Sequence, residues 1–473
     1  MAQARALYEQ VIEIEPAHFD ALHFLGIIAY QASQPELAAE LMGRAIDINP
    51  GHAEAHSNRG NVLRRLRQFA ASLQSYDRAI ELKPDYPDAY NNRGNVLRDL
   101  GQREAALLSY DRAIELRADF ADAWVNRGNA LRDLGRHEAA LQSYDGAIAL
   151  KPDYVAAHNN RGVALRDLRR YQQAVQSYDR AIALKPDYAE AHGNRANALR
   201  DLKQYDAALQ SYERAIALKP DYAEAYSNRG TTLNDLNRPQ AALASLDRAL
   251  QIDPDYDFLY GAWLLTKMSI CDWKDIAYHF AQLIEKIERN EKATSPFILL
   301  AIPCLPAQQR KAAEIWLEAK YPASNALPTI ARRPTHDRIR IAYVSGDFRE
   351  HPVAHLMAEL FERHERTRFE PIAISLRPEA ESRTGQRVRR AFAQFVDVSS
   401  KSDLEVAQLM RGLEIDIAVD LMGFTTDSRT GVFAHRPAPI QVIYLGYTGT
   451  MGMSYMDYLI ADERVIPESH RSF

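Results

Sequence analysis

The most regular feature of the sequence is a pattern of small, aromatic and turn-forming residues that recurs every 34 positions in its first half. The turn position holds Pro16, Pro50, Pro84, Ala118, Pro152, Pro186, Pro220 and Pro254. A glycine, a tyrosine and an alanine recur at fixed offsets, as at Gly94, Tyr110 and Ala113. This pattern predicts two helices per unit, packed closely at the small residues. Because one helix pair cannot bury its own apolar face, the units are expected to stack into an α-solenoid over residues 1–254.

A polar stripe recurs on the first helix of each unit. Its first position holds Asn58, Asn92, Asn126, Asn160, Asn194 and Asn228. A second asparagine follows three residues later in several units, and an aspartate follows after seven, as at Asn95 and Asp99. Offsets of three and seven lie on one helix face, so stacking would align the stripe into ladders along a groove. Amides in such ladders can hold a peptide backbone without reading its sequence; the alternative is a solvated face copied by duplication.

An arginine directly follows each first-position asparagine, as Arg93 follows Asn92 and Arg127 follows Asn126. The aspartates of the polar stripe lie nearby in the predicted stack. We expect these arginines to form structural ion pairs with them.

The pattern changes after Pro254, where the period stops. Residues 255–337 predict a helical bridge with helices over 258–270, 273–289 and 308–319, and with a linker over 331–337. From residue 338, short β-branched runs alternate with helical segments. They predict strands over 339–344, 371–376, 394–398, 415–421 and 440–445, and helices over 353–364, 385–392, 403–411 and 429–434. Such alternation is typical of a parallel, doubly wound, Rossmann-like α/β lobe, expected over residues 338–473.

Candidate site residues are those that directly follow strands, because ligands of a doubly wound sheet bind beyond the carboxyl ends of its strands. After the first strand, Pro352 favours the first position of a helix and puts His351 at the helix N-terminus. Asp347, four residues earlier, is a candidate to orient the His351 ring or to accept a proton itself. The structural alternative is a histidine that caps a helix and an aspartate that closes a turn.

A glycine-rich loop over residues 445–452 follows the fifth predicted strand. Its glycines allow a close backbone approach and offer N–H groups to a phosphate or a sugar. The loop matches neither a Walker loop nor a dinucleotide fingerprint. Two carboxylate pairs, Glu414 with Asp416 and Asp253 with Asp255, resemble metal-binding pairs. Because the first opens a strand and the second lies at the repeat turn, both are interpreted as structural and no metal site is predicted.

Composition narrows the class of protein. Lys and Arg number 58 against 63 Asp and Glu, a net charge of −5, which argues against a nucleic-acid backbone as the main partner. Two cysteines, Cys271 and Cys304, are too few for a disulfide framework and fit a reducing compartment. No apolar run approaches the ~20 residues of a membrane span. We expect a cytoplasmic protein with no nucleic-acid or membrane partner.

Two resemblances to known families follow from these residues. The repeats resemble the tetratricopeptide repeat family at its 34-residue period. In the second half, the distinctive residues are 338–348 (RIRIAYVSGDF), 351–357, 436–450 (with RPAPIQ and LGYTGT) and 456–458, together with Cys271-Asp272-Trp273. In these motifs the sequence resembles O-linked N-acetylglucosamine transferases, in particular bacterial members with such repeats, and the related SPINDLY-type fucosyltransferases.

The resemblance implies an inverting, metal-independent transferase of the GT-B type that moves N-acetylglucosamine from UDP-GlcNAc to serine or threonine of a protein. UDP-GlcNAc is then a substrate, and no cofactor is implied. Asp347 and His351 match family residues near the reacting centre, whereas Pro352, Leu445 and Gly446 match substrate-binding positions. The first-position asparagines match the family's peptide-holding ladder. The alternatives are an O-fucosyltransferase of SPINDLY type and a non-catalytic repeat scaffold with a degenerate transferase tail.

The sequence departs from the family pattern at three points. Residues 294–298 contain no histidine where some members carry one, and Thr448 replaces a proline. A GT-B enzyme has two Rossmann-like halves, whereas this sequence ends at Phe473 after one. We therefore expect residues 1–473 alone not to transfer sugar. The expected partners are protein acceptors and a nucleotide-sugar, and a homodimer through the repeats is possible.

Overall fold

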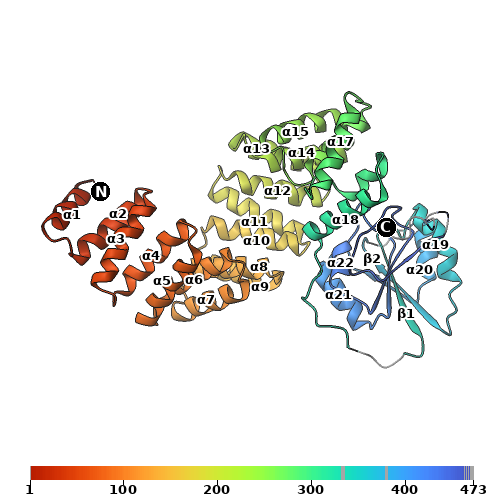
Figure 1. Ribbon diagram of the computed structural model, residues 1–473. Helices are drawn as coiled ribbons and strands as arrows, with labels where there is room; N and C mark the ends of the chain where they lie inside the picture. The colour runs from red at the N-terminus through yellow and green to blue at the C-terminus, as the bar shows by residue number, and fades with distance from the viewer. Residues whose placement is uncertain are drawn as a thin grey trace. The chain divides into compact units, whose positions relative to one another are not determined.

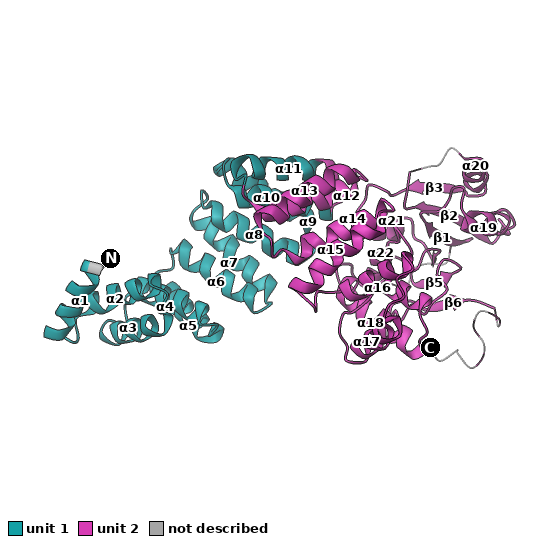
Figure 2. Ribbon diagram, turned by 90° about the horizontal axis from the view of Figure 1, so that it is seen from above, with its two compact units in different colours: residues 1–167, 173–186 teal, residues 168–172, 187–473 magenta. Residues whose placement is uncertain are grey.

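Figure 1 shows the computed structural model, with paired helices in the first part of the chain and a sheet with helices in the last. The structure describes residues 2–331, 336–378 and 382–462, together with residues 464, 466 and 468. Residues 332–335 of the predicted linker and 469–473 of the predicted lobe lie outside the described residues. The chain forms two compact units, residues 1–167 with 173–186 and residues 168–172 with 187–473 (Figure 2).

Paired helices make up the first unit, as the repeat period predicts. They are α1 (Ala2–Ile14), α2 (Phe19–Gln31), α3 (Pro35–Ile48), α4 (Ala53–Arg65), α5 (Phe69–Leu82), α6 (Pro87–Asp99), α7 (Arg103–Leu116), α8 (Ala121–Asp133), α9 (His137–Leu150), α10 (Val155–Asp167) and most of α11 (Tyr171–Leu184). The second unit continues with α12 (Ala189–Asp201), α13 (Tyr205–Leu218), α14 (Ala223–Asp235) and α15 (Pro239–Ile252). The predicted α-solenoid is confirmed.

A fully buried tyrosine fills the seam between the two helices of a repeat. Tyr144 on α9 lies against Gly128 on α8, where an added Cβ would stand 2.5 Å from the tyrosine ring. The Tyr144 hydroxyl donates a hydrogen bond to Asn129 Oδ1 at 2.7 Å. The same arrangement of glycine and tyrosine recurs at Gly60 with Tyr76, at Gly94 with Tyr110 and at Gly162 with Tyr178. The predicted close approach at the small residues is therefore confirmed.

The arginines of the first helices form ion pairs, but the predicted partners are wrong. Arg127 Nε donates to Asp111 Oδ1 at 2.6 Å, and its Nη1 donates to Ser143 Oγ at 2.7 Å. Arg93 and Arg161 repeat this arrangement in their own units. Asp111 lies on α7, the second helix of the preceding repeat. Arg93, Arg127 and Arg161 therefore each join two neighbouring repeats and do not pair with the aspartates of the polar stripe.

Helices also fill the predicted bridge: α16 (Leu259–Ser269), α17 (Ile276–Glu288), the 3₁₀-helix η1 (Pro296–Ala301) and α18 (Pro306–Lys320). Trp263 on α16 stands 34 residues after Arg229, and its Nε1 donates to Asp247 Oδ1 at 2.6 Å. The repeat geometry thus continues one helix beyond the predicted boundary. At the other end, Leu317 of α18 packs into the core of the sheet. The domain boundaries at residues 254 and 337 stay predictions.

Parallel strands form a single sheet in the last part of the chain. They are β1 (Ile339–Ser345), β2 (Phe369–Ser375), β3 (Gln394–Asp397), β4 (Ile417–Asp420), β5 (Ile440–Tyr444) and β6 (Tyr458–Ile460). Their order is β3-β2-β1-β4-β5-β6. The first five lie where the sequence predicts strands, whereas the short edge strand β6 was not predicted.

Both faces of the sheet are covered, because successive side chains of each strand point to opposite sides. Val344 of β1 joins one core with residues of α21 (Asp403–Gly412) and α22 (Thr430–Ala434). Tyr343 joins the other core with residues of α19 (Pro352–Glu362) and α20 (Arg383–Arg390). This arrangement confirms the predicted doubly wound, Rossmann-like fold. Within the described ranges, no helix is both long enough and apolar enough to cross a membrane.

Candidate functional site

The strand order reverses between β1 and β4, because the chain passes from β1 to β2 on one side and later adds β4 on the other. In doubly wound sheets, ligands bind at this switch point, beyond the carboxyl ends of the strands. The loops after β1, β4 and β5 begin there. These loops hold the residues that the sequence singled out, from Asp347 to Pro352 and at Leu445 and Gly446.

Asp347 and His351 lie in the loop between β1 and α19. The Asp347 side chain is only 9% exposed and lies 3.3 Å from Arg349 Nη2, while its backbone N–H donates to Ser345 Oγ at 3.0 Å. His351 is the N-cap of α19, and its Nδ1 accepts a hydrogen bond from the backbone N–H of Val353 at 3.3 Å. His351 Nδ1 lies 3.6 Å from Asp347 Oδ2, which is too long for a hydrogen bond.

The capping bond restricts what the His351 ring can do. A ring nitrogen that accepts a hydrogen bond carries no proton, so the proton of neutral imidazole sits on Nε2, which is then a donor. Nε2 can accept a proton only in the other neutral tautomer, in which the ring proton sits on Nδ1 and Nε2 carries none. Asp347 stands close enough to accept a hydrogen bond from such an Nδ1–H after a small movement. The histidine cap that the sequence analysis gave as the structural alternative is therefore present. Pro352 is exposed at the first helical position beside it, as predicted.

The loop after β4 joins the loop after β1, and sequence reasoning missed it. The buried Asp420 carboxylate accepts hydrogen bonds from the backbone N–H groups of Met422 at 2.8 Å and Gly423 at 3.3 Å. Met422 Sδ in turn lies 3.4 Å from the backbone nitrogen of Gly346 and 3.5 Å from Ser345 Oγ. The signal available in the sequence was a carboxylate near the end of the fourth predicted strand and a glycine just after that strand.

Burial raises the pKa of Asp420 from 3.8 to about 6, although its two backbone hydrogen bonds oppose the shift. The charged carboxylate is poorly solvated at this position, which favours the protonated form. Asp420 therefore gains a proton near pH 6, where a carboxylate on a protein surface is still charged.

The glycine-rich loop after β5 packs against the loop after β4. A Cβ at Gly446 would overlap the backbone carbonyl of Leu421, so only glycine fits there. Leu445, just before it, has a positive φ of 69° and is 38% exposed. The close approach that the sequence predicted for Gly446 is thus made to protein backbone. With Leu421 and Met422 between them, the three loops bring Asp347, His351, Pro352, Leu445 and Gly446 to one edge of the sheet.

The first-position asparagines of the polar stripe are half-buried, and Asn58, Asn126, Asn160 and Asn228 each make a hydrogen bond to a neighbouring first helix. Asn160 Nδ2 donates to Asn129 Oδ1 at 3.0 Å, and Asn228 Nδ2 donates to Asn197 Oδ1 at 3.1 Å. The same position holds Asn58, Asn92 and Asn126, which are hydrogen-bonded to His23 or Asn91, and Asn194 on α12. Part of the amide hydrogen-bonding capacity therefore holds the repeats together.

Within the second unit, the polar stripe ends near the sheet. Burial raises the pKa of Asp235, the last aspartate of the stripe; Arg200 opposes the shift, and the Asp427 carboxylate adds to it. Asp427 lies in the loop after β4 and forms an ion pair with Arg377, which follows β2. The stripe thus comes within electrostatic reach of the carboxyl edge of the sheet.

The carboxylate pairs interpreted as structural lie away from this edge. Asp416 Oδ2 accepts a hydrogen bond from the backbone N–H of Arg340 at 2.8 Å, at the start of β1. Asp253 Oδ1 accepts one from the backbone N–H of Asp255 in the repeat turn. Across the described ranges, no three His, Cys, Asp or Glu side chains gather in a way that could hold a metal ion.

The contact at Gly446 gives a direct test of how the loops are held. Gly446→Ala is expected to destabilise the α/β region by about 1–3 kcal/mol or more, because the new methyl meets backbone that cannot move alone. Gly412→Ala is the matched control, since a Cβ at Gly412 has no neighbour within 4 Å. Calorimetric melting compares the two variants; equal melting temperatures would contradict the packing described.

The raised pKa of Asp420 predicts a pH-dependent stability. A folded-state pKa above the unfolded value means that the folded protein binds the proton more tightly, so a stability cost present above about pH 6 disappears as the pH falls towards 3.8. Asp420→Asn keeps an acceptor for Met422 and removes the titration. Between about pH 7 and pH 4.5, wild type should gain about 2 kcal/mol relative to this variant. Parallel pH profiles of Tm for the two proteins would refute the assignment.

Comparisons with known proteins agree with this architecture. The model of "Glycosyl transferase family 41" matches residues 319–472. Models described as "TPR repeat" match residues 60–97, 94–131, 128–168 and 196–234, and others described as "Tetratricopeptide repeat" match residues 2–53, 155–188, 177–210 and 223–256.

Curated relatives carry transferase names. A probable UDP-N-acetylglucosamine–peptide N-acetylglucosaminyltransferase SEC of Arabidopsis thaliana is 34% identical over 223 residues, 43% of this chain and 22% of that protein. The enzyme named UDP-N-acetylglucosamine–peptide N-acetylglucosaminyltransferase of Caenorhabditis elegans is 29% identical over 42% of this chain and 18% of its own length. This chain thus spans about a fifth of the length of these relatives.

A solved structure, a mutant O-GlcNAc transferase of Thermobaculum terrenum, is 25% identical with a TM-score of 0.43, over 67% of this chain and 55% of that chain. This chain therefore joins residues that match tetratricopeptide-repeat models to a region, residues 319–472, that matches the model of glycosyl transferase family 41.

Proposed function

We propose that the chain is part of a protein O-glycosyltransferase, which moves N-acetylglucosamine from UDP-GlcNAc to serine or threonine of proteins held by the repeats. The observation that carries the proposal is the match of residues 319–472 to glycosyl transferase family 41. Asp347 and His351, the proposed site residues, lie within that range and at the switch point of the sheet. The names of the curated relatives support the donor and the type of acceptor. UDP-GlcNAc enters as a substrate, and the proposed reaction uses no resident cofactor.

The proposed reaction assigns different tasks to the two loop residues. The acceptor hydroxyl oxygen bonds to the anomeric carbon of the sugar, the bond to UDP breaks, and the hydroxyl proton passes to a base. In the structure His351 Nε2 is a donor, whereas the Asp347 carboxylate accepts hydrogen bonds or protons. We assign Asp347 as the proton acceptor in this arrangement. His351 donates to an oxygen of the acceptor or the donor, and becomes a base only in the tautomer that has lost the Nε2 proton and carries its proton on Nδ1, held by the Asp347 carboxylate.

The polar stripe is proposed to hold the acceptor protein. Its last aspartate, Asp235, lies within electrostatic reach of Asp427 beside the sheet edge, so a peptide on the stripe of α12 and α14 would continue towards Asp347. A homodimer through the repeats and a cytoplasmic location stay predictions.

The first prediction of this proposal concerns His351. In the full natural protein, His351→Ala should lower kcat by about 10²–10⁴-fold if the ring transfers a proton, and should mainly raise KM if it only orients a substrate. His355→Ala is the control, because His355 lies one turn further on the same helix and pairs with Glu350. Transfer of radiolabelled N-acetylglucosamine to protein measures both. Unchanged kcat and KM in the His351 variant would remove His351 from the mechanism.

The second prediction concerns the stripe. Replacing Asn126, Asn160 and Asn194 together with alanine should weaken acceptor binding by roughly 0.5–1.5 kcal/mol per lost hydrogen bond. The same change should also lower the melting temperature, because Asn126 and Asn160 bond to neighbouring first helices.

Asn91→Ala separates these two effects. Asn91 is buried and accepts the hydrogen bond from Asn126, so its loss weakens the helix contact while the first-position amides remain. The Asn91→Ala variant should have a lower melting temperature than wild type and should bind acceptor with wild-type affinity in a calorimetric titration. If the triple variant binds acceptor as tightly as wild type, the stripe does not hold the acceptor.

A further inference from the structure

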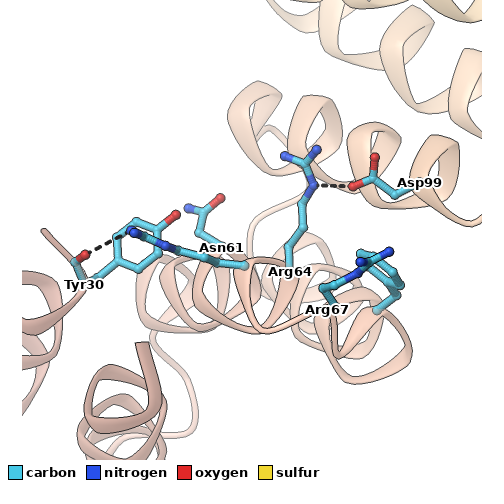
Figure 3. Close-up of a pocket in the computed structure, with 7 residues that line it drawn as sticks. Tyr30, Asn61, Arg64, Arg67 and Asp99 are labelled. Carbon is cyan, nitrogen blue, oxygen red and sulfur yellow. Dashed lines mark hydrogen bonds and ion pairs between the residues drawn. The ribbon is translucent and has the colours of Figure 1, made fainter. Parts of the chain in front are cut away.

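A basic cavity of about 540 Å³ lies in the first unit, on the early repeats. Its walls come from the ends of α2 and α4, the turn after α4, and the helices α5 and α6. Figure 3 shows the side chains that line it, which are Tyr30, Asn61, Arg64, Arg65, Arg67, Phe69 and Asp99. We refer to this cavity as the arginine pocket. Asn61 belongs to the polar stripe, so the pocket opens on the same helix face.

The arginine pocket carries excess positive charge. Arg64 is neutralised by Asp99, whose Oδ2 accepts a hydrogen bond from Arg64 Nε at 2.7 Å. Arg65 has only uncharged acceptors, the Ser33 hydroxyl at 3.0 Å and the Tyr30 carbonyl at 3.4 Å. The Arg67 guanidinium makes no hydrogen bond or ion pair with any residue in the described part of the chain, whereas its backbone N–H donates to the Arg64 carbonyl at 2.9 Å. Two guanidinium groups therefore lack a balancing carboxylate.

The position of Arg65 in the repeat lattice makes this charge unusual. Arg65 stands 34 residues before Asp99, the position where the following units carry Asp99, Asp133, Asp167, Asp201 and Asp235. The polar stripe therefore changes sign at the arginine pocket. A ligand that lies along the stripe would contact carboxylates in the later repeats and guanidinium groups at the arginine pocket. The ligand group that complements the arginine pocket is therefore an anion.

We propose that the arginine pocket binds an acidic side chain, carboxylate or phosphate, of an extended protein segment lying on the polar stripe. A guanidinium group presents paired N–H donors that match the two oxygens of a carboxylate or phosphate. Arg65 is already oriented by Ser33 and by the Tyr30 ring, 5.4 Å beneath it, which lowers the entropy lost on binding. The proposal concerns binding by the repeats alone, so it stands or fails separately from the proposed sugar transfer.

Fluorescence anisotropy with the whole chain tests the proposal. The probes are short fluorescein-labelled peptides in which serine alternates with glutamate, with phosphoserine or with lysine. The double variant Arg65→Ala with Arg67→Ala should weaken binding of the glutamate and phosphoserine peptides at least about tenfold. The control, Arg103→Ala with Arg136→Ala, also removes two exposed positive charges from the first unit but lies outside the pocket, so it should change binding less than about twofold.

The outcomes show which anion the pocket prefers and which result would overturn the proposal. Tighter binding of phosphoserine than of glutamate identifies phosphate as the preferred anion, and the reverse identifies carboxylate; both support the proposal. Arg65→Asp places at this position the carboxylate that the following repeats carry there. This variant should therefore lose binding of the glutamate peptide and bind the lysine peptide more tightly than wild type. Absence of binding to either acidic peptide, or equal losses in the pocket and control variants, would overturn it. Circular dichroism checks that all variants keep their helices.

Discussion

In several repeats, one buried tyrosine connects the packing of the two helices with the polar surface of the repeat. The Tyr144 ring lies against Gly128, so the two helices approach closely. The Tyr144 hydroxyl donates a hydrogen bond to Asn129 Oδ1. Asn129 also accepts a hydrogen bond from Asn160 of the next unit. Since a helix pair cannot bury its apolar face alone, this chain of contacts fixes the register between units. The polar stripe is therefore held in place by the same residues that form the core.

At the sheet, backbone contacts between loops have a comparable role. Asp420 orients the loop after β4, Met422 contacts Gly346, and Gly446 lies directly against Leu421. These contacts join three loops whose strands are far apart in the sequence. Asp347 and His351 belong to the first of these loops, so their positions depend on the packing of the other two. In the second unit, Asp235 and Asp427 connect the electrostatics of the stripe with those of this edge.

Most of the fold was predictable because its signals are local or periodic. The 34-residue period gave the helix pairs, and alternating runs gave five strands with bounds close to the observed ones. The residues after β1 and β5 were predictable because strand ends are where ligands bind in such sheets. The partner of Arg127 could not be predicted, because it depends on how neighbouring repeats pack. That packing brings the Arg127 side chain to Asp111 rather than to an aspartate of the stripe. Asp420 was missed because its role depends on Met422 reaching a loop some 75 residues away.

The central claim is that a protein acceptor lies on the polar stripe and reaches the carboxyl edge of the sheet at Asp347. A crystal structure of the full natural protein with UDP and an acceptor peptide tests this claim most directly. The account predicts peptide backbone against the stripe asparagines of the later repeats. It also predicts an acceptor hydroxyl within hydrogen-bond distance of Asp347 or His351. A peptide bound away from the stripe, or a hydroxyl far from both residues, would contradict it.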